Sequence, residues 1–490
     1  MNLSELTIKK AMIGLSEKKF SARKLAEDCL KNIEERNKEL NVFLEVFDDV
    51  LAQADVADKI ISSGEANPLT GIPLAIKDNI LIKGRKCSSA SKILENYTAS
   101  YDATVIKKLK DAGVIFMGRT NMDEFAMGSS TESSAFGPTK NPFDLSRVPG
   151  GSSGGSAVAV ASGMALGALG SDTAGSIRQP AAFCGLVGMK PTYGAVSRYG
   201  LMALGSSIDQ IGPITKTVED AEIIFTAIAG ADSLDATSVD VSPTEEFSWP
   251  SRPSLRSARA GENSSAGFTI GVPRDFLSEG VDPEVLKNFE ESLEKLRAAG
   301  CKIIDISLPL VKYSLAVYYI LMPAEASTNL ARYDGMRFGF SAEAPNLLEV
   351  YKKTRGEGFG REVRRRIMLG TYVLSHGYYD AYYNKATAVR GQIKHEFEKV
   401  FEKVDLIATP TAPTPAFKLG EKIDPVSMYL SDIFTVPANI ADLPAVSVPT
   451  GKNKDGLPLS FQLMASIGGE SALFSTARIL EKYLPAGDLS

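Results

Sequence analysis

Histidine is almost absent from this 490-residue sequence, which contains only His376 and His395. Because histidine is the most frequent general base of hydrolases, its scarcity confines that kind of site to two positions. His395 lies in the charged run IKHEFEKV, where we expect a solvated helix face. His376, in LSHGYYD, could complete a catalytic triad, although we favour a structural role. A hydrolytic site elsewhere in the chain would need a different base.

Cysteine is also scarce, and the four cysteines lie far apart without a CxxC pair. This pattern argues against a disulfide scaffold and against a cysteine-based zinc site, and it suits a reducing compartment. The first residues have neither the apolar run of a signal peptide nor the character of a transit peptide, so we predict a cytoplasmic protein. The cysteines are Cys29, Cys87, Cys184 and Cys301.

An excess of positive charge is missing too, because 54 Lys and Arg stand against 59 Asp and Glu, a formal net charge of −5. A protein that grips nucleic acid or an anionic membrane through a broad basic surface is therefore not expected. The most apolar run, AVAVASGMALGALG at 157–170, is shorter than the roughly 20 apolar residues of a membrane helix. We predict that it forms a buried, tightly packed helix.

Helical and strand-like segments alternate along the chain. Residues 21–40 begin with a serine suited to cap a helix and then repeat apolar residues along one face. A helix closed by Gly113 and followed by a buried strand is expected at 103–121, and the same pattern returns at 283–306. This alternation indicates an α/β protein, and one large domain is favoured because no linker or repeat is evident. Further strands are expected at 41–47, within 401–417 and at 445–449, and a terminal helix at 470–484.

The stretch PGGSSGGSAVAVASG at 149–163 places six glycine and serine residues, 150–155, in front of small apolar ones. It is not a P-loop, because no lysine follows the glycines until Lys190, and the GxGxxG motif is absent. A flexible linker fits poorly with the buried helix expected directly after it. We therefore favour a reaction site made of close-packed backbone and hydroxyl groups.

A second stretch, SDTAGSIRQP at 171–180, supports this interpretation. The small residues Ala174 and Gly175 precede Ser176, so that successive backbone N–H groups can converge near its hydroxyl, as an oxyanion hole requires. Ser176 is therefore a candidate nucleophile, provided that a base is near.

A lysine can be that base if burial lowers the pKa of its amine and leaves it neutral. Lys77 is a candidate, because the apolar run GIPLAIKDNI at 71–80 would carry it into the interior. A strand-end lysine paired with Asp78 is an equally good interpretation of the local sequence.

Residues 150–194 resemble the Gly/Ser-rich signature of the amidase signature family. The resemblance implies a single large α/β domain with a mixed central β-sheet covered by helices. It also implies a Ser–cis-Ser–Lys triad of Ser176 as nucleophile, Ser152 as bridging serine after a cis peptide bond, and Lys77 as base, with Ser153 as the less favoured bridge. The implied oxyanion donors are the N–H groups of Thr173, Ala174, Gly175 and Ser176.

Three further segments are similar to one branch of the family, the glutamine-hydrolysing subunits of tRNA-dependent amidotransferases. They are 121–151, 358–383 and 428–449, and the likeness covers nearly the whole chain. The resemblance implies that Arg365 or Arg366 grips the α-carboxylate of glutamine and that Asp432 holds its ammonium group. The structural alternatives are a solvated helix face for the arginines and a helix N-cap for Asp432. Asp123 and Glu124 would line this site or buttress it.

The same branch implies partners. A B subunit would bind the mischarged tRNA, ATP and Mg²⁺ and would amidate Glu-tRNA(Gln) or Asp-tRNA(Asn), while a small C subunit would brace the pair. This chain would hold no metal or cofactor of its own and would have no membrane contact. The rival interpretations are a free-standing amidase that acts on other small amides and a non-catalytic scaffold subunit.

Within one domain we expect four regions. The segment 240–268 is rich in Ser, Pro and Arg, contains the only tryptophan, Trp249, and is expected to be an exposed loop or insertion. It is longer than is usual in the family and could alter a partner surface. The regions are an N-terminal helical part at 1–65, a catalytic core at 66–239, the insertion at 240–268, and the remaining core with the glutamine-binding segments at 269–490.

Overall fold

The computed structural model describes residues 3, 5–241, 267–277 and 280–483, so that nearly all of the predicted insertion at 240–268 lies outside the described residues. Within the described residues, eleven strands form one mixed β-sheet in the order β1-β3-β2-β4-β6-β5-β10-β11-β9-β7-β8. The strands are β1 Phe43–Val46, β2 Pro73–Lys77, β3 Ile115–Thr120, β4 Gly167–Asp172, β5 Val187–Lys190, β6 Gln210–Thr215, β7 Thr269–Val272, β8 Lys302–Asp305, β9 Leu406–Pro410, β10 Ala445–Lys452 and β11 Pro458–Ala465.

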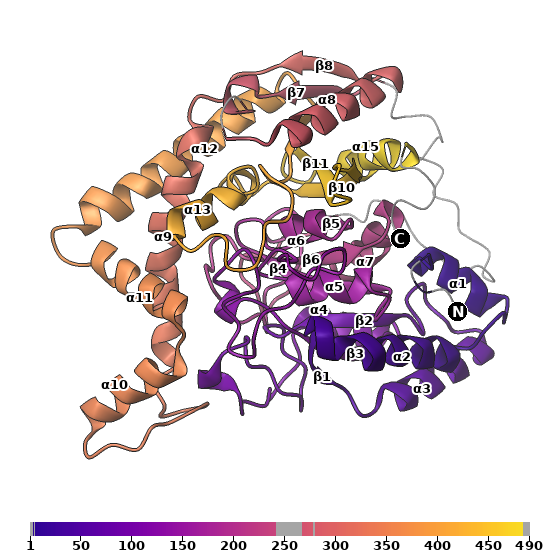
Figure 1. Ribbon diagram of the computed structural model, residues 1–490, viewed down its shortest axis with the longest axis horizontal. Helices are drawn as coiled ribbons and strands as arrows, with labels where there is room; N and C mark the ends of the chain where they lie inside the picture. The colour runs from indigo at the N-terminus through magenta and orange to yellow at the C-terminus, as the bar shows by residue number, and fades with distance from the viewer. Residues whose placement is uncertain (1–2, 4, 242–266, 278–279, 484–490) are drawn as a thin grey trace.

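Strand pairing is parallel between β2 and its neighbours β3 and β4 and between β7 and its neighbours β8 and β9, and antiparallel elsewhere. Helices cover this sheet (Figure 1). The prediction of one large α/β domain with a mixed central sheet is therefore confirmed. The helices are α1 Ile8–Ser16, α2 Ala22–Leu40, α3 Val50–Ser63, α4 Thr104–Asp111, α5 Gly154–Ala161, α6 Arg178–Phe183, α7 Val218–Ile228, α8 Pro283–Ala298, α9 Ser314–Asn329, α10 Leu347–Gly358, α11 Arg361–Val373, α12 Lys385–Phe401, α13 Pro425–Tyr429, α14 Val436–Ile440 and α15 Glu470–Lys482.

Shorter helical segments join these elements, and helices α9 to α12 extend to one side of the sheet in Figure 1. The segments are the 3-10 turns η1 Lys92–Leu94, η2 Glu124–Ala126, η3 Arg274–Leu277, η4 Val311–Tyr313, η5 Leu330–Arg332 and η7 Leu430–Asp432, and the π-helix η6 Asp380–Asn384.

Local sequence signals set several element boundaries as expected. The Ser21 hydroxyl accepts a hydrogen bond from Lys24 N at 3.0 Å and caps α2. After α4, Gly113 takes a φ of 75°, a left-handed conformation that glycine adopts without steric cost, and β3 follows. The helix and strand predicted at 283–306 are α8 and β8.

The apolar run at 157–170 differs from the single buried helix that we expected. Helix α5 ends at Ala161, Gly163 turns the chain with a φ of 65°, and β4 begins at Gly167. Both pieces are almost fully buried, so a continuous apolar run cannot distinguish a buried helix from a buried strand by periodicity. The glycine at 163, where the left-handed turn is needed, is the signal that separates them.

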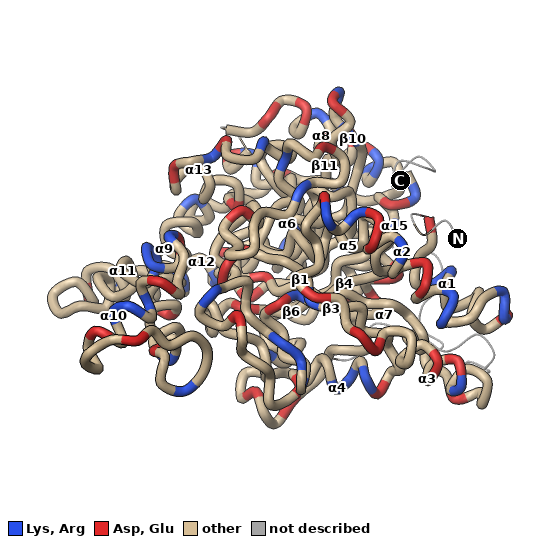
Figure 2. Tube along the Cα trace, turned by 60° about the horizontal axis from the view of Figure 1, so that its bottom comes forward, with Lys and Arg blue, Asp and Glu red and all other residues tan. Residues whose placement is uncertain are grey.

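The centre of the sheet is buried on both faces, since every residue of β2, β3, β4 and β6 is buried. Acidic and basic residues are interspersed along the chain in Figure 2 rather than gathered by sign. None of the helices in the described ranges is long and apolar enough to cross a membrane. The four cysteines are buried and no disulfide joins them.

Candidate active site

The Gly/Ser stretch is a buried turn that leads into α5 rather than a linker. Gly150 has a φ of 83°, and the Gly151–Ser152 peptide bond is cis, as the resemblance implies. A Cβ atom at Gly151 would overlap Asp123 Oδ2 and one at Gly155 would overlap the carbonyl of Asn121, so both positions require glycine. The stretch thus brings the Ser152 and Ser153 hydroxyls to the end of β2.

Lys77 is the last residue of β2, and its side chain is fully buried. Its Nζ donates hydrogen bonds to Ser152 Oγ at 2.7 Å, to Ser153 Oγ at 2.7 Å and to Ser171, where the carbonyl is at 3.2 Å and Oγ at 3.0 Å. The alternative of an ion pair with Asp78 is wrong, because that carboxylate instead pairs with Arg119 at 3.0 Å.

Burial lowers the pKa of Lys77 to about 7, although the carboxylates of Asp123, Asp172 and Asp209 act in the opposite direction. Desolvation penalises the charged amine more than these neighbours stabilise it. The neutral amine, which can accept a proton, is therefore accessible near neutral pH. This is the state that a general base requires.

The two adjacent serines have different surroundings. Ser153 Oγ donates to the Ser171 carbonyl at 3.3 Å besides contacting Lys77, so it faces β4. Within the described chain, Ser152 Oγ is hydrogen-bonded only to Lys77, which leaves its other side available to a nucleophile. The geometry therefore favours Ser152 over Ser153 as the bridge.

Ser176 lies two residues before the start of α6, and it is 6% exposed. Its carbonyl accepts a hydrogen bond from Ser153 N at 3.2 Å, which places it against the Gly/Ser turn. Among the described residues, no hydrogen bond joins its hydroxyl to Ser152. Such catalytic hydrogen bonds are commonly long before substrate binds and tighten in the complex.

The backbone around Ser176 is held by Asp172, the last residue of β4. Its carboxylate accepts hydrogen bonds from Gly175 N at 2.8 Å, from Ile177 N at 3.1 Å and from both Nε and Nη2 of Arg178. Burial acts to raise the pKa of Asp172, but the Arg178 guanidinium and its hydrogen bonds hold it well below its usual range. The carboxylate is thus permanently ionised and fixes the turn.

This arrangement corrects one predicted oxyanion donor. The Gly175 N–H donates to Asp172, so a carboxylate already occupies its acceptor position. The N–H groups of Ala174 and Ser176 have no hydrogen-bond partner in the described part of the chain. Both residues are buried, with exposed fractions of 5% and 6%. These two N–H groups remain candidate donors for a developing oxyanion, as does the N–H group of Thr173, whose hydroxyl is bound to Asp209 at 2.7 Å.

A cavity of about 340 Å³ opens beside this centre, lined by α11, by residues 128–130 and by α13. Arg366 of α11 is buried, and its guanidinium lies 5.4 and 5.5 Å from the ring centres of Tyr319 and Tyr429, which stack on each other. Arg365 is half-buried and pairs with Glu362, to which Arg366 Nε also donates at 2.7 Å. The structure thus places both candidate arginines at the cavity, with only Arg366 in a desolvated setting.

Asp432 lies behind the cavity lining at the end of η7 and accepts a hydrogen bond from the Ser129 hydroxyl. Its Oδ1 is buried without a hydrogen-bond partner among the described residues. It does not cap a helix with its side chain, so the N-cap alternative is wrong. Burial raises the pKa of Asp432 to about 7, with Asp172 acting the same way and Lys422 and Arg366 opposing. A cationic ligand would satisfy both the free oxygen and the charge.

Thr435 links the cavity to the nucleophile segment, because its Oγ1 lies 3.1 Å from the Asp432 carbonyl and 2.5 Å from the Ala174 carbonyl. Gln179 makes a second link, since it donates to Ser129 O at 3.0 Å and accepts from Gly151 N at 2.9 Å. Hydrogen bonds therefore connect the residues around the cavity to the nucleophile segment and to the Gly/Ser turn.

Asp123 and Glu124 buttress this site. Asp123 accepts hydrogen bonds from Thr131 N at 2.8 Å and Ser133 Oγ at 2.8 Å, and burial raises its pKa. Glu124 accepts from Ser91 Oγ at 2.5 Å and Gly360 N at 2.9 Å, and burial raises its pKa to about 7. Both carboxylates hold loops in place.

The histidines take no part in the site. His376 is exposed in the turn after α11, and His395 is exposed on α12, where it pairs with Glu398. No group of three or more His, Cys, Asp or Glu suited to a metal ion occurs among the residues that the structure describes.

Sequence reasoning missed several residues that organise the site. Arg178 is fully buried and donates to Asn439 Oδ1 at 2.6 Å and to Gln462 Oε1 at 2.7 Å, which ties the nucleophile turn to α14 and β11. An arginine two positions after the candidate nucleophile was a visible signal. Ser129, which holds Asp432, carried no local signal, because its partner is 303 residues away.

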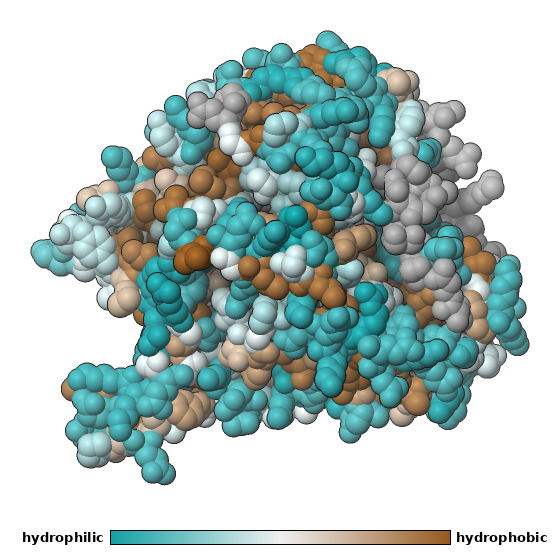
Figure 3. Space-filling model, in the orientation of Figure 1, coloured by the Kyte–Doolittle hydropathy of each residue, from teal (hydrophilic) through white to brown (hydrophobic). Residues whose placement is uncertain are grey.

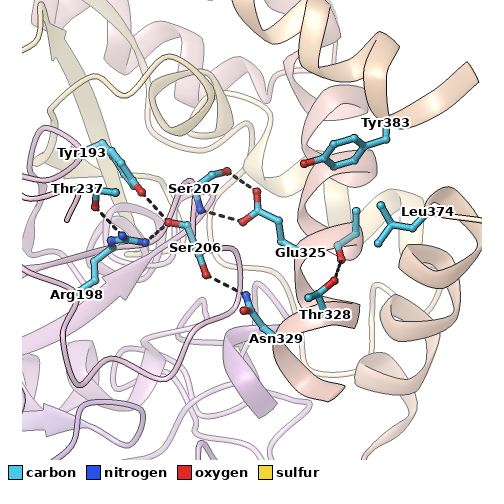
Figure 4. A pocket seen from close by; sticks show the side chains of 11 residues that line it. Tyr193, Arg198, Ser206, Ser207, Thr237, Glu325, Thr328, Asn329, Leu374 and Tyr383 are labelled. Atoms are coloured by element: carbon cyan, nitrogen blue, oxygen red, sulfur yellow. Dashed lines mark hydrogen bonds between the residues drawn. The ribbon is translucent and has the colours of Figure 1, made fainter. Parts of the chain in front are cut away.

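A second cavity of about 450 Å³ lies between the loop at 204–207 and α9 (Figure 4). Glu325 of α9 accepts hydrogen bonds there from Ser207 N at 2.9 Å and Ser207 Oγ at 2.5 Å. The same loop donates to Asp209 from Leu204 N at 2.8 Å, and Asp209 holds the Thr173 hydroxyl. The loop beside this cavity is thus connected to the nucleophile segment through Asp209, but the cavity shares no lining residue with the first cavity.

The fold and site together define a hydrolase with a serine nucleophile candidate and a buried lysine in place of a histidine base. A family model described as Amidase matches residues 24–474, and the chain belongs to this amidase family.

Similar proteins match over nearly the full chain. A protein of Koribacter versatilis, named as the A subunit of glutamyl-tRNA(Gln) amidotransferase, is 51% identical, covering 99% of this chain and 100% of that one. One of the same name from Carboxydothermus hydrogenoformans is 52% identical, covering 98% of each chain. The crystal structure of the A subunit of glutamyl-tRNA(Gln) amidotransferase from Thermotoga maritima is 44% identical with a TM-score of 0.80, covering 99% of this chain and 96% of that one.

Proposed function

We propose that this chain hydrolyses glutamine and passes the ammonia to a partner protein that amidates Glu-tRNA(Gln). The observation that carries the proposal is that, among the described residues, Asp432 has a buried oxygen without a hydrogen-bond partner, Arg366 has a buried guanidinium, and the buried Lys77 contacts Ser152. A carboxyl group behind the lining of the cavity and a guanidinium on that lining suit the ammonium and carboxylate of an amino acid. The names of the full-length relatives support glutamine as the amide donor and a tRNA-dependent complex.

The chemistry follows from the site. Neutral Lys77 takes the proton of Ser176 through the Ser152 hydroxyl, while Ser176 Oγ forms a bond to the amide carbon of glutamine. The carbonyl oxygen becomes an oxyanion held by the N–H groups of Ala174 and Ser176. When the C–N bond breaks, the proton returns through Ser152 to the departing ammonia, and water then releases glutamate from Ser176.

The partner's role completes the proposal. A B subunit binds ATP, Mg²⁺ and the mischarged tRNA and uses the ammonia, and a small C subunit braces the two. The tRNA is bound mainly through the B subunit, so this chain need not hold it itself, which agrees with its net charge of −5 and with the interspersed charges in Figure 2. Ile423 and Val426, just before and within α13, are 86% and 64% exposed, and Figure 3 shows further apolar residues on the surface of this face of the molecule. Such apolar side chains offer a surface for a partner to cover.

Replacing Arg366 with lysine is expected to raise the KM for glutamine by about 10- to 100-fold, because lysine keeps the charge but loses the bidentate fit to a carboxylate. The matched control is Arg365→Lys, which changes a half-buried neighbour and should alter KM by less than about threefold. Steady-state kinetics on glutamine and on a simple amide without an α-carboxylate provide the comparison. Equal losses on both substrates, or high activity on simple amides alone, would favour the free-standing amidase.

The pH dependence gives a second test of the same cavity. Glutamine needs ionised Asp432 and neutral Lys77, and both forms increase as pH rises through about 7. The logarithm of kcat/KM should therefore fall with a slope approaching two below pH 7 and level off above it. In Asp432→Asn the slope should drop to one, because only Lys77 still titrates. A wild-type slope of one, unchanged by the substitution, would remove Asp432 from the substrate site.

A further inference from the structure

Besides Ser152 and Ser153, the Lys77 amine contacts a third serine, Ser171 of β4. A protonated lysine has three N–H donors, and here they meet Ser152 Oγ at 2.7 Å, Ser153 Oγ at 2.7 Å and the Ser171 oxygens at 3.0 and 3.2 Å. The surrounding oxygens thus match the ammonium ion that forms when Lys77 accepts the nucleophile's proton.

Asn79 fixes the Ser171 hydroxyl from the opposite side. Its Nδ2 donates to Ser171 Oγ at 2.9 Å, and its backbone is held by hydrogen bonds to Lys77 O at 2.8 Å and from Met202 N at 2.8 Å. Asn79 is 2% exposed, and its Oδ1 has no partner among the described residues. Among the described residues, the hydrogen bond to Ser171 Oγ is therefore the one that orients the buried side-chain amide of Asn79.

We infer that Asn79 and Ser171 form a positioning pair for the lysine base, in which Asn79 keeps the Ser171 hydroxyl an acceptor toward Lys77. A hydroxyl has one hydrogen and two lone pairs. Asn79 donates to one lone pair of the Ser171 oxygen and Lys77 donates to the other. The Ser171 hydroxyl hydrogen then points away from Lys77 and does not bond to the lone pair of the lysine nitrogen. That lone pair is left to face Ser152, which is the direction of proton transfer. This inference rests on the proposed hydrolytic function but not on the identity of the amide.

The test compares Ser171→Ala with the matched control Ser156→Ala. Ser156 is also fully buried against β4, where its hydroxyl bonds to Leu169 O at 3.1 Å and Thr120 Oγ1 at 2.8 Å, but it does not touch Lys77. The carboxylates of Asp123, Asp172 and Asp209 face Lys77 in both variants. Ser171→Ala should lower the maximal kcat by about tenfold with KM unchanged. It should also move the acid limb of the pH profile to lower pH, because the ammonium loses an acceptor.

A fluorophosphonate probe separates this inference from the choice of substrate. In its reaction Ser176 Oγ bonds to phosphorus, fluoride leaves, and the hydroxyl proton passes through Ser152 to Lys77. In Ser171→Ala the acid limb of the pH profile of the labelling rate should move to lower pH, as it does for turnover. In Asn79→Ala it should move in the same direction by a smaller amount. Thermal unfolding of each variant confirms that it is folded.

A labelling profile of Ser171→Ala that coincides with that of Ser156→Ala would overturn the positioning pair. If Ser171→Ala does not fold, Asn79→Ala decides, and an unshifted profile there would equally overturn it. A wild-type protein that labels normally but does not hydrolyse glutamine would refute the proposed function and leave the positioning pair in place.

Discussion

Replacing Ser176 with alanine in the assembled complex is expected to abolish glutamine-dependent amidation, with a loss of about 10⁴-fold or more, because no other hydroxyl can form the acyl intermediate. Supplying ammonium chloride should restore amidation to the wild-type level, since the partner's chemistry is untouched. The measurement is amidated tRNA formed from glutamine and from ammonium in parallel reactions.

The control for this variant is Ser156→Ala, which removes a buried hydroxyl away from Lys77 and should leave both reactions unchanged. Unaltered glutamine-dependent amidation by Ser176→Ala would show that this chain is a scaffold and not the glutaminase. Loss of both reactions would indicate a disrupted complex, which size-exclusion chromatography of the assembly would reveal.

Replacing Lys77 with methionine should lower kcat/KM for glutamine by about 10²- to 10⁴-fold, the usual contribution of a general base. Methionine fills a similar buried volume without a titratable group. The remaining activity should also lose the part of its pH dependence near 7 that burial of the lysine creates. Steady-state rates between about pH 5.5 and 9 cover the predicted change.

Lys216 provides the matched control, because it is also buried, its pKa is lowered to about 8 by burial, and its amine donates to the carbonyl of Leu6 at 3.0 Å, outside the site. Lys216→Met should keep kcat/KM within about threefold of the wild type. An equal loss in both variants would mean that buried lysines support only folding. Full activity in Lys77→Met would leave the site without a base.

The sequence predicted the fold class correctly, and it singled out the triad candidates, because the signals for both are local. Helix caps, glycine stops and the compact signature at 150–194 each depend on neighbouring residues. The prediction for the apolar run at 157–170 was wrong for the same reason. A residue buried on every side shows no periodicity, so only the three-dimensional packing reveals where α5 ends and β4 begins.

Long-range contacts decided the details of the candidate site. Nothing near Gly175 in the chain shows that its N–H faces Asp172 rather than a substrate. The neighbours Arg365 and Arg366 are chemically identical in the sequence, and only their rotation on α11 buries one and leaves the other half-exposed. The Ser171–Asn79 contact joins the ends of two strands that are 92 residues apart.

The amino-acid sequence by itself determined which chemistry is available. It has almost no histidine, two serine-bearing turns and one lysine in an apolar run, and a serine–lysine mechanism is consistent with all three features. Only the tertiary structure shows that burial lowers the pKa of that lysine, that it contacts both serines, and which arginine is buried at the cavity. Electrostatic properties depend on desolvation and on distances of a few ångströms between segments far apart in the chain, and neither quantity exists until the chain is packed.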